Sequence, residues 1–96
     1  MDDSYRQDVL NYAESTLRLL AQVPNQHPDP TAKRDVLSNI KVMQSRLDHL
    51  SPKLRAAISP LLQQAWDAAE GNQLGLAMTH VKGVRKEVES VNGAEG

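Results

Sequence analysis

The chain has 96 residues, of which 40% are hydrophobic, with a formal net charge of −1 and no cysteine. This length is that of one domain, and the near-neutral charge argues against a nucleic-acid binder that depends on bulk positive charge. Without cysteine, disulfides, thiolate nucleophiles and cysteine-based zinc sites are excluded. The start MDDSYRQDVL is acidic where a secretion signal is basic, and no segment approaches the ~20 apolar residues that span a bilayer. We therefore expect a single domain over residues 1–96, in the cytoplasm and away from membranes.

The first expected helix covers about residues 4–22. Ser4 and Gln7 have the spacing of a capping box, and the apolar residues that follow keep a helical period. Pro24 should end the helix near Gln22, because proline disfavours helical geometry in the residue before it. The proline-rich segment PNQHPDP then indicates an extended loop.

The second expected helix covers about residues 30–50. Asp29 followed by Pro30 is typical of a helix start, with a capping side chain and then proline in the first turn. Alternating steps of four and three residues separate the apolar positions, which predicts one buried face against a partner helix. These positions are Val36, Ile40, Met43, Leu47 and Leu50.

Two prolines divide the next region. Ser51-Pro52 and Ser59-Pro60 both resemble helix starts, so we expect a short helix over 52–58 and a longer one over 60–70. A single kinked helix is the alternative, because the apolar series continues in phase across Pro60. Trp66 lies on this series and is the expected core anchor.

The last expected helix covers about residues 72–91. Gly71 should take the left-handed conformation that ends the preceding helix, and Asn72 should cap the next one. Residues 92–96 should form a disordered tail, because they offer nothing to bury. The expected fold is all-α, an antiparallel up-and-down four-helix bundle with a short extra helix before the third long helix.

One face of the last helix is the candidate contact surface. Gly75, Thr79 and Gly83 recur every four residues, opposite the apolar stripe. A glycine inside a helix costs about 1 kcal/mol relative to alanine, so close approach of a second backbone would explain two of them. Tolerance of glycine at an exposed surface is the alternative. The expected protein-contact face consists of Gly75, Leu76, Thr79, Lys82, Gly83 and Lys86.

A small basic cluster overlaps this face. Lys82, Arg85 and Lys86 could meet a phosphate or an acidic partner, although Glu87 and Glu89 follow at once. A solvated helix face near a C-terminus, where cations complement the helix dipole, is the other interpretation.

His80 is the candidate phosphoacceptor. The sequence THVKG in a helical domain of this size is similar to histidine phosphotransfer domains. In that family a lysine and a glycine usually follow the histidine by three and four residues. Here Lys82 and Gly83 follow by two and three, and one residue on a helix is a rotation of about 100°.

No other chemistry is indicated by the sequence. The histidines are far apart and the serines lack a nucleophile-elbow context, so we expect no metal, no cofactor and no enzymatic activity. The expected function is a non-enzymatic protein–protein interaction module, as an adaptor, inhibitor or regulatory protein. Its partner would be another protein or a second copy in a homodimer, with nucleic acid disfavoured. The alternative function is histidine phosphotransfer centred on His80.

Overall fold

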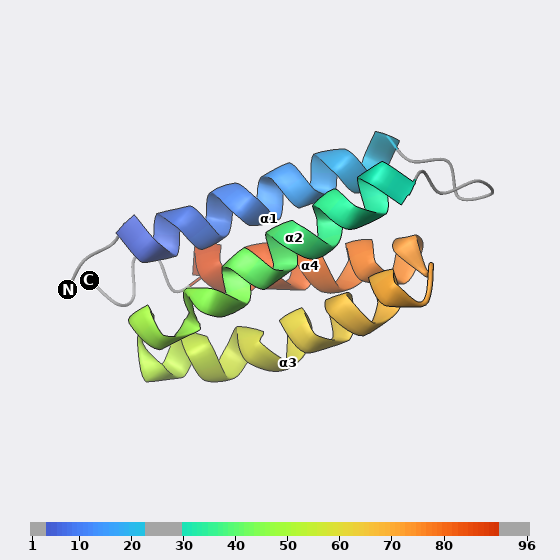
Figure 1. Ribbon diagram of the computed structural model, residues 1–96. Helices are drawn as coiled ribbons and strands as arrows, with labels where there is room; N and C mark the ends of the chain where they lie inside the picture. The colour runs from blue at the N-terminus through green and yellow to red at the C-terminus, as the bar shows by residue number, and fades with distance from the viewer. Residues whose placement is uncertain (1–3, 23–29, 91–96) are drawn as a thin grey trace.

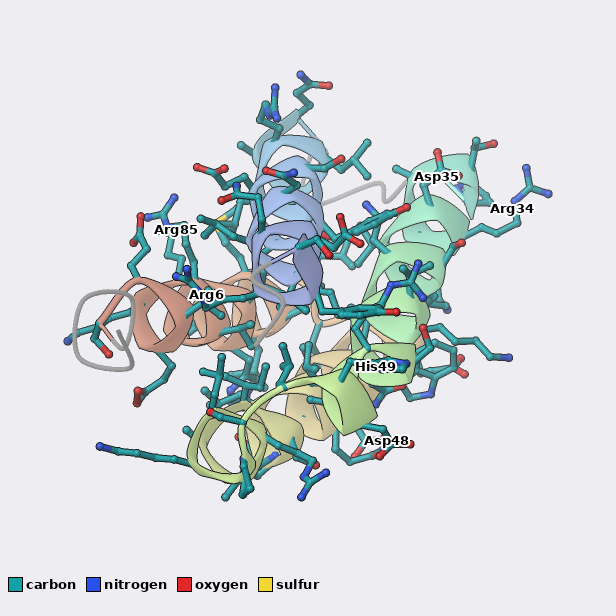
Figure 2. The ribbon with its side chains drawn as sticks, turned by 90° about the vertical axis from the view of Figure 1, so that its left-hand side faces the viewer. Arg6, Arg34, Asp35, Asp48, His49 and Arg85 are labelled. Carbon is teal, nitrogen blue, oxygen red and sulfur yellow. The ribbon has the colours of Figure 1, made fainter. Side chains whose placement is uncertain are left out.

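The computed structural model describes residues 4–22 and 30–90, which form four α-helices and one short 3₁₀ helix. Successive helices run in opposite directions along the bundle (Figure 1), and the end view shows them arranged as a ring (Figure 2). Each helix packs against the next one in the chain, and α4 closes the ring on α1. The predicted antiparallel four-helix bundle is confirmed. The elements are α1 (Ser4–Gln22), α2 (Pro30–Ser45), η1 (Leu47–His49), α3 (Pro52–Glu70) and α4 (Leu74–Ser90).

The core of the bundle is almost entirely aliphatic. Each long helix buries one stripe of residues at helical spacing, as the sequence predicts. Thr16 is the buried polar residue of the described core, and its hydroxyl donates to the Tyr12 carbonyl oxygen at 2.6 Å. A hydrogen bond of this kind removes most of the cost of burying a hydroxyl. The largest inaccessible side chains are Val9, Val36, Ile40, Met43, Leu54, Ile58, Leu62, Val81, Val84 and Val88.

The second helix ends earlier than the sequence predicts. The α-helical bonding of α2 stops at Ser45, and η1 replaces the rest of the expected helix over 30–50. The N–H groups of His49 and Leu50 donate three residues back, at 3.0 and 3.1 Å, which is the 3₁₀ pattern. The tighter turn redirects the chain toward α3 while keeping Leu50 in the core.

The third helix is continuous through Pro60, so the predicted separation into 52–58 and 60–70 is wrong and the single-helix alternative is correct. Proline removes one N–H and leaves the carbonyl of Ala56 without its helical partner. Pro60 and Ala56 are both exposed, so water can bond that carbonyl. The short helix that precedes α3 is η1 instead. The predicted start at Ser51-Pro52 is confirmed, because the Ser51 hydroxyl accepts from the Leu54 N–H at 3.3 Å.

Asn72, rather than Gly71, takes the left-handed conformation at the end of α3. Its φ is 62°, whereas Gly71 has φ −86°. The Gln73 N–H donates to the Ala68 carbonyl at 2.8 Å, and the Asn72 N–H to the Ala69 carbonyl at 3.1 Å. These two bonds define a Schellman motif with Asn72 as its left-handed residue.

The fourth helix consequently begins at Leu74, not at residue 72. The Ala77 N–H donates to the Gln73 carbonyl at 3.0 Å, so Gln73 occupies the capping position that was expected for Asn72. Asn72 belongs to the end of α3. Residue 91 and the predicted tail 92–96 lie outside the described residues.

Alanines, not Trp66, hold fully buried positions in the second half of α3 and the first half of α4. Ala65, Ala69 and Ala77 are fully inaccessible, and they lie on the buried faces of the two helices. Trp66 is only partly buried and packs against the edge of the core. The expectation that Trp66 anchors the core is therefore corrected.

Lys33 ties α2 to the end of α3. Its ammonium donates to the Glu70 carbonyl oxygen at 3.0 Å. That carbonyl lies in the last turn of α3, where helical carbonyls lack partners and the helix dipole favours a cation. Lys33 thus links α2 and α3 at this end of the bundle.

The turn between α3 and α4 gives a matched pair of substitutions. Asn72→Ala should lower the free energy of unfolding by about 1 kcal/mol, because a left-handed alanine is strained. Gly71→Ala should be neutral or stabilising by up to ~1 kcal/mol, since its Cβ would lie 3.5 Å from the nearest atom, the Asp67 carbonyl oxygen. Urea unfolding of both variants measures the difference. A larger loss for Gly71→Ala than for Asn72→Ala would contradict the assigned turn.

Candidate functional site

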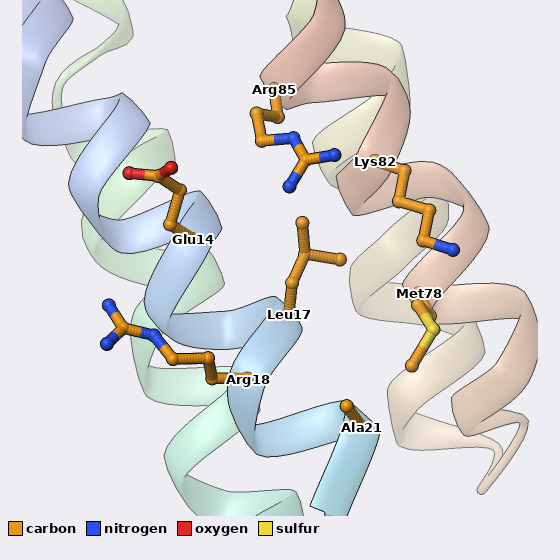
Figure 3. Close-up of a pocket in the computed structure, with 7 residues that line it drawn as sticks. All are labelled: Glu14, Leu17, Arg18, Ala21, Met78, Lys82 and Arg85. Atoms are coloured by element: carbon orange, nitrogen blue, oxygen red, sulfur yellow. The ribbon is translucent and has the colours of Figure 1, made fainter.

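Helices α1 and α4 form a groove at the surface of the bundle, with a volume of about 410 Å³ (Figure 3). The two helices are neighbours because the ring of helices closes between the first and the last. We call this surface the α1/α4 groove. It is lined by Glu14, Leu17, Arg18 and Ala21 of α1 and by Met78, Lys82 and Arg85 of α4.

The floor of the α1/α4 groove is apolar. Leu17 points from α1 into the space between the helices (Figure 3), and it is also part of the core. Met78 approaches from α4 and packs against the core, while Ala21 is small and exposed. The groove is therefore a place where the hydrophobic interior reaches the surface.

Charged side chains surround this floor on both sides. Glu14 and Arg18 lie on the α1 edge, Lys82 lies on the α4 edge, and the Arg85 guanidinium reaches over the space beside Leu17 (Figure 3). Within residues 4–22 and 30–90, none of these four charged side chains forms an ion pair or hydrogen bond. The groove thus presents three cations and one carboxylate that are available to a ligand.

The outer face of α4 adjoins the groove. Its six predicted residues form three pairs that are seven positions apart, and each pair lies on one line along the helix. Leu76 is 47% exposed and is the large hydrophobic residue that the described surface presents to solvent. Thr79 donates its hydroxyl to the Gly75 carbonyl at 3.2 Å, and a Cβ at Gly75 would meet no atom within 4 Å. The pairs are Gly75 with Lys82, Thr79 with Lys86, and Leu76 with Gly83.

Gly83 does not lie on open surface. A Cβ added at this position would lie 3.3 Å from Leu61 Cδ1 and 3.6 Å from Leu61 Cδ2. The glycine at position 83 therefore allows α3 of the same chain to approach closely. This contact explains one of the two glycines of α4, and it does not require a partner protein. Lys82, at the other edge of the face, lies on the α1 side. Partner contact through this face remains a prediction.

The surroundings of His80 differ from the pattern of the histidine phosphotransfer domains that the sequence resembles. His80 is partly buried, and Lys82 lines the groove with α1. Two residues on a helix are a rotation of about 200°, so these two side chains diverge. Gly83, the glycine of the THVKG sequence, has the Leu61 side chain of α3 beside it.

The other histidines do not join His80. His49 stacks on Tyr5 with ring centroids 4.1 Å apart, at the end of the bundle, and His27 lies outside the described residues. Beside this stack, Arg46 Nε lies 3.8 Å from Asp8 Oδ2, which joins α1 to the turn before η1. No group of three or more histidines or carboxylates in the described part of the chain is placed to hold a metal ion.

Comparison with protein-family models, with curated proteins and with solved structures finds no match for the chain. None of the described helices is long and apolar enough to cross a bilayer.

Sequence reasoning identified only the α4 half of the groove. Lys82 and Arg85 were singled out as a basic cluster, but Leu17 and Arg18 of α1 were not linked to them. The signal was present in the topology, because the first and last helices of an up-and-down four-helix bundle are neighbours.

The two glycines of α4 should respond differently to substitution. Gly75→Ala should stabilise the protein by about 0.5–1 kcal/mol, because alanine favours the helix and nothing obstructs its methyl group. Gly83→Ala should gain less, because the Leu61 side chain must shift. Gly83→Leu should destabilise the packing of α3 on α4, contrary to the tolerance that an open position would give. Urea unfolding measures all three, and equal gains at both alanines would refute the close contact.

Proposed function

We propose that the chain is a non-enzymatic interaction module that binds a partner protein through the side of the bundle formed by α1 and α4. The observation that supports this proposal is the α1/α4 groove. Its apolar floor is surrounded by charged groups that have no partner among the described residues, and protein interfaces commonly combine an apolar centre with a polar rim.

The groove and the outer face of α4 form one continuous surface, because Lys82 belongs to both. Leu76 adds an exposed apolar side chain to this surface. One exposed leucine is ordinary for a soluble protein, so the proposal depends on the groove and takes Leu76 as an addition. A partner that covers both regions would remove Leu17, Met78 and Leu76 further from water.

An adaptor, inhibitor or regulatory role is part of the proposal. A module of this type acts by occupying its partner or by bringing two partners together, and neither action requires catalytic groups. The faces of α2 and α3 remain available while the α1/α4 side is occupied, since those helices close the opposite side of the ring.

Site-specific photo-crosslinking tests the proposed surface. We expect p-benzoylphenylalanine in place of Met78 to crosslink to a discrete protein in an extract of the organism that encodes the chain. The same group in place of Gln64, an exposed residue on α3, should not crosslink to it. Mass spectrometry identifies the crosslinked peptide on each side.

Competition with unlabelled chain tests whether the crosslink is specific. Excess unlabelled wild-type chain should abolish the crosslink from position 78, whereas a Lys82→Glu, Arg85→Glu chain should compete poorly. Equal crosslinking from both positions, or no discrete product from position 78, would contradict a binding surface on the α1/α4 side.

A further inference from the structure

We propose that the occupant of the α1/α4 groove is an acidic amphipathic helix of the partner, an inference that rests on the proposed function. Its apolar residues would contact Leu17 and Met78, and its carboxylates would pair with Arg18, Lys82 and Arg85. Helix-in-groove recognition uses this combination of apolar anchors and flanking charges.

The groove is richer in cations, relative to carboxylates, than the rest of the described surface. The groove holds three of the eleven lysines and arginines but one of the twelve carboxylates. Among the described residues outside the groove, eight cations stand with seven carboxylates, so charge there is nearly balanced. A locally positive site favours a negative partner segment and guides its orientation.

The same charges disfavour a second copy of this chain at the groove. A symmetric dimer through this surface would bring two cation-rich grooves together, each with three cations and one carboxylate. Like charges placed opposite one another across an interface are costly. The homodimer expected from the sequence thus has no electrostatic support at this site.

The shape of the groove favours a helix over a small amphiphile. Small-molecule sites usually enclose about 70–90% of their ligand, but Ala21 and Lys82 on the two sides of this groove are exposed. Cations stand on both edges, with Arg18 on α1 and Lys82 on α4 (Figure 3). A helix with a central apolar stripe and carboxylates on both flanks matches that arrangement.

The apolar floor should supply most of the affinity, and the cations should supply orientation and selectivity. Exposed ion pairs are individually weak, because water and salt screen them. Reversing three such charges together should nevertheless weaken binding about tenfold, since about 1.4 kcal/mol corresponds to a factor of ten.

Fluorescence polarisation with designed peptides tests the inference. The probe is a fluorescein-labelled synthetic helix with a leucine stripe and glutamate on both flanks, and its control carries lysine in place of each glutamate. Wild-type chain should bind the acidic peptide saturably, more weakly as salt rises, and should bind the basic peptide at least about tenfold more weakly.

Two charge-reversed variants locate the site. Arg18→Glu, Lys82→Glu, Arg85→Glu should weaken the acidic peptide about tenfold and strengthen the basic one. Arg34→Glu, Lys41→Glu, Lys53→Glu makes the same charge change at exposed positions of α2 and α3, and should alter binding less than about twofold. Circular dichroism confirms that both variants are folded.

Several results would overturn the inference. Equal binding of the two peptides, or equal losses in the two variants, would show that the groove does not select acidic helices. Binding of sodium laurate without binding of either peptide would assign the groove to a small amphiphile. A dimer in sedimentation that the groove variant abolishes would assign the groove to a second copy of the chain.

A position-78 crosslink without preference for the acidic peptide would refute only this inference, whereas loss of the crosslink would refute the proposed function.

Discussion

Close packing of α3 against α4 determines how the last helix is presented to the rest of the molecule. Ala65, Ala69 and Ala77 are fully buried small residues of these helices, and a Cβ at Gly83 would lie 3.3 Å from Leu61 Cδ1. The Schellman turn at Asn72 joins them without a long connection. The contact at Gly83 and the buried stripe of α4 together set the rotation of this helix about its axis, and therefore which side of it faces α1.

The groove is a consequence of that fixed rotation. With Val81 and Val84 directed into the core, Lys82 and Arg85 emerge along the line where α4 meets α1. The position of Leu17 in the opposing helix then supplies the apolar floor. The charged and apolar parts of the proposed site therefore come from two helices that are distant in sequence and adjacent only because the ring closes.

Much of the fold could be predicted from helical periodicity. The structure at Pro60, at the turn after α3 and at Gly83 could not, because it depends on contacts made only in the folded chain. The buried stripes of all four helices were predictable, because apolar spacing depends only on the sequence of each helix. Pro60 was misjudged as a break because its solvent exposure, which lets water bond the freed carbonyl, is a tertiary property. At the turn, Gly71 was the stronger local candidate for positive φ, yet the bonding pattern places Asn72 there. Gly83 was misplaced because only the folded chain brings Leu61 to it.

The central claim is that a partner helix binds between α1 and α4, and amide chemical-shift mapping tests it most directly. Titrating ¹⁵N-labelled chain with the acidic helical peptide should produce its largest shifts within residues 14–21 and 78–85, while α2 and the exposed face of α3 change little. Contiguous shifts centred on α2 and α3, with residues 14–21 unchanged, would contradict the account.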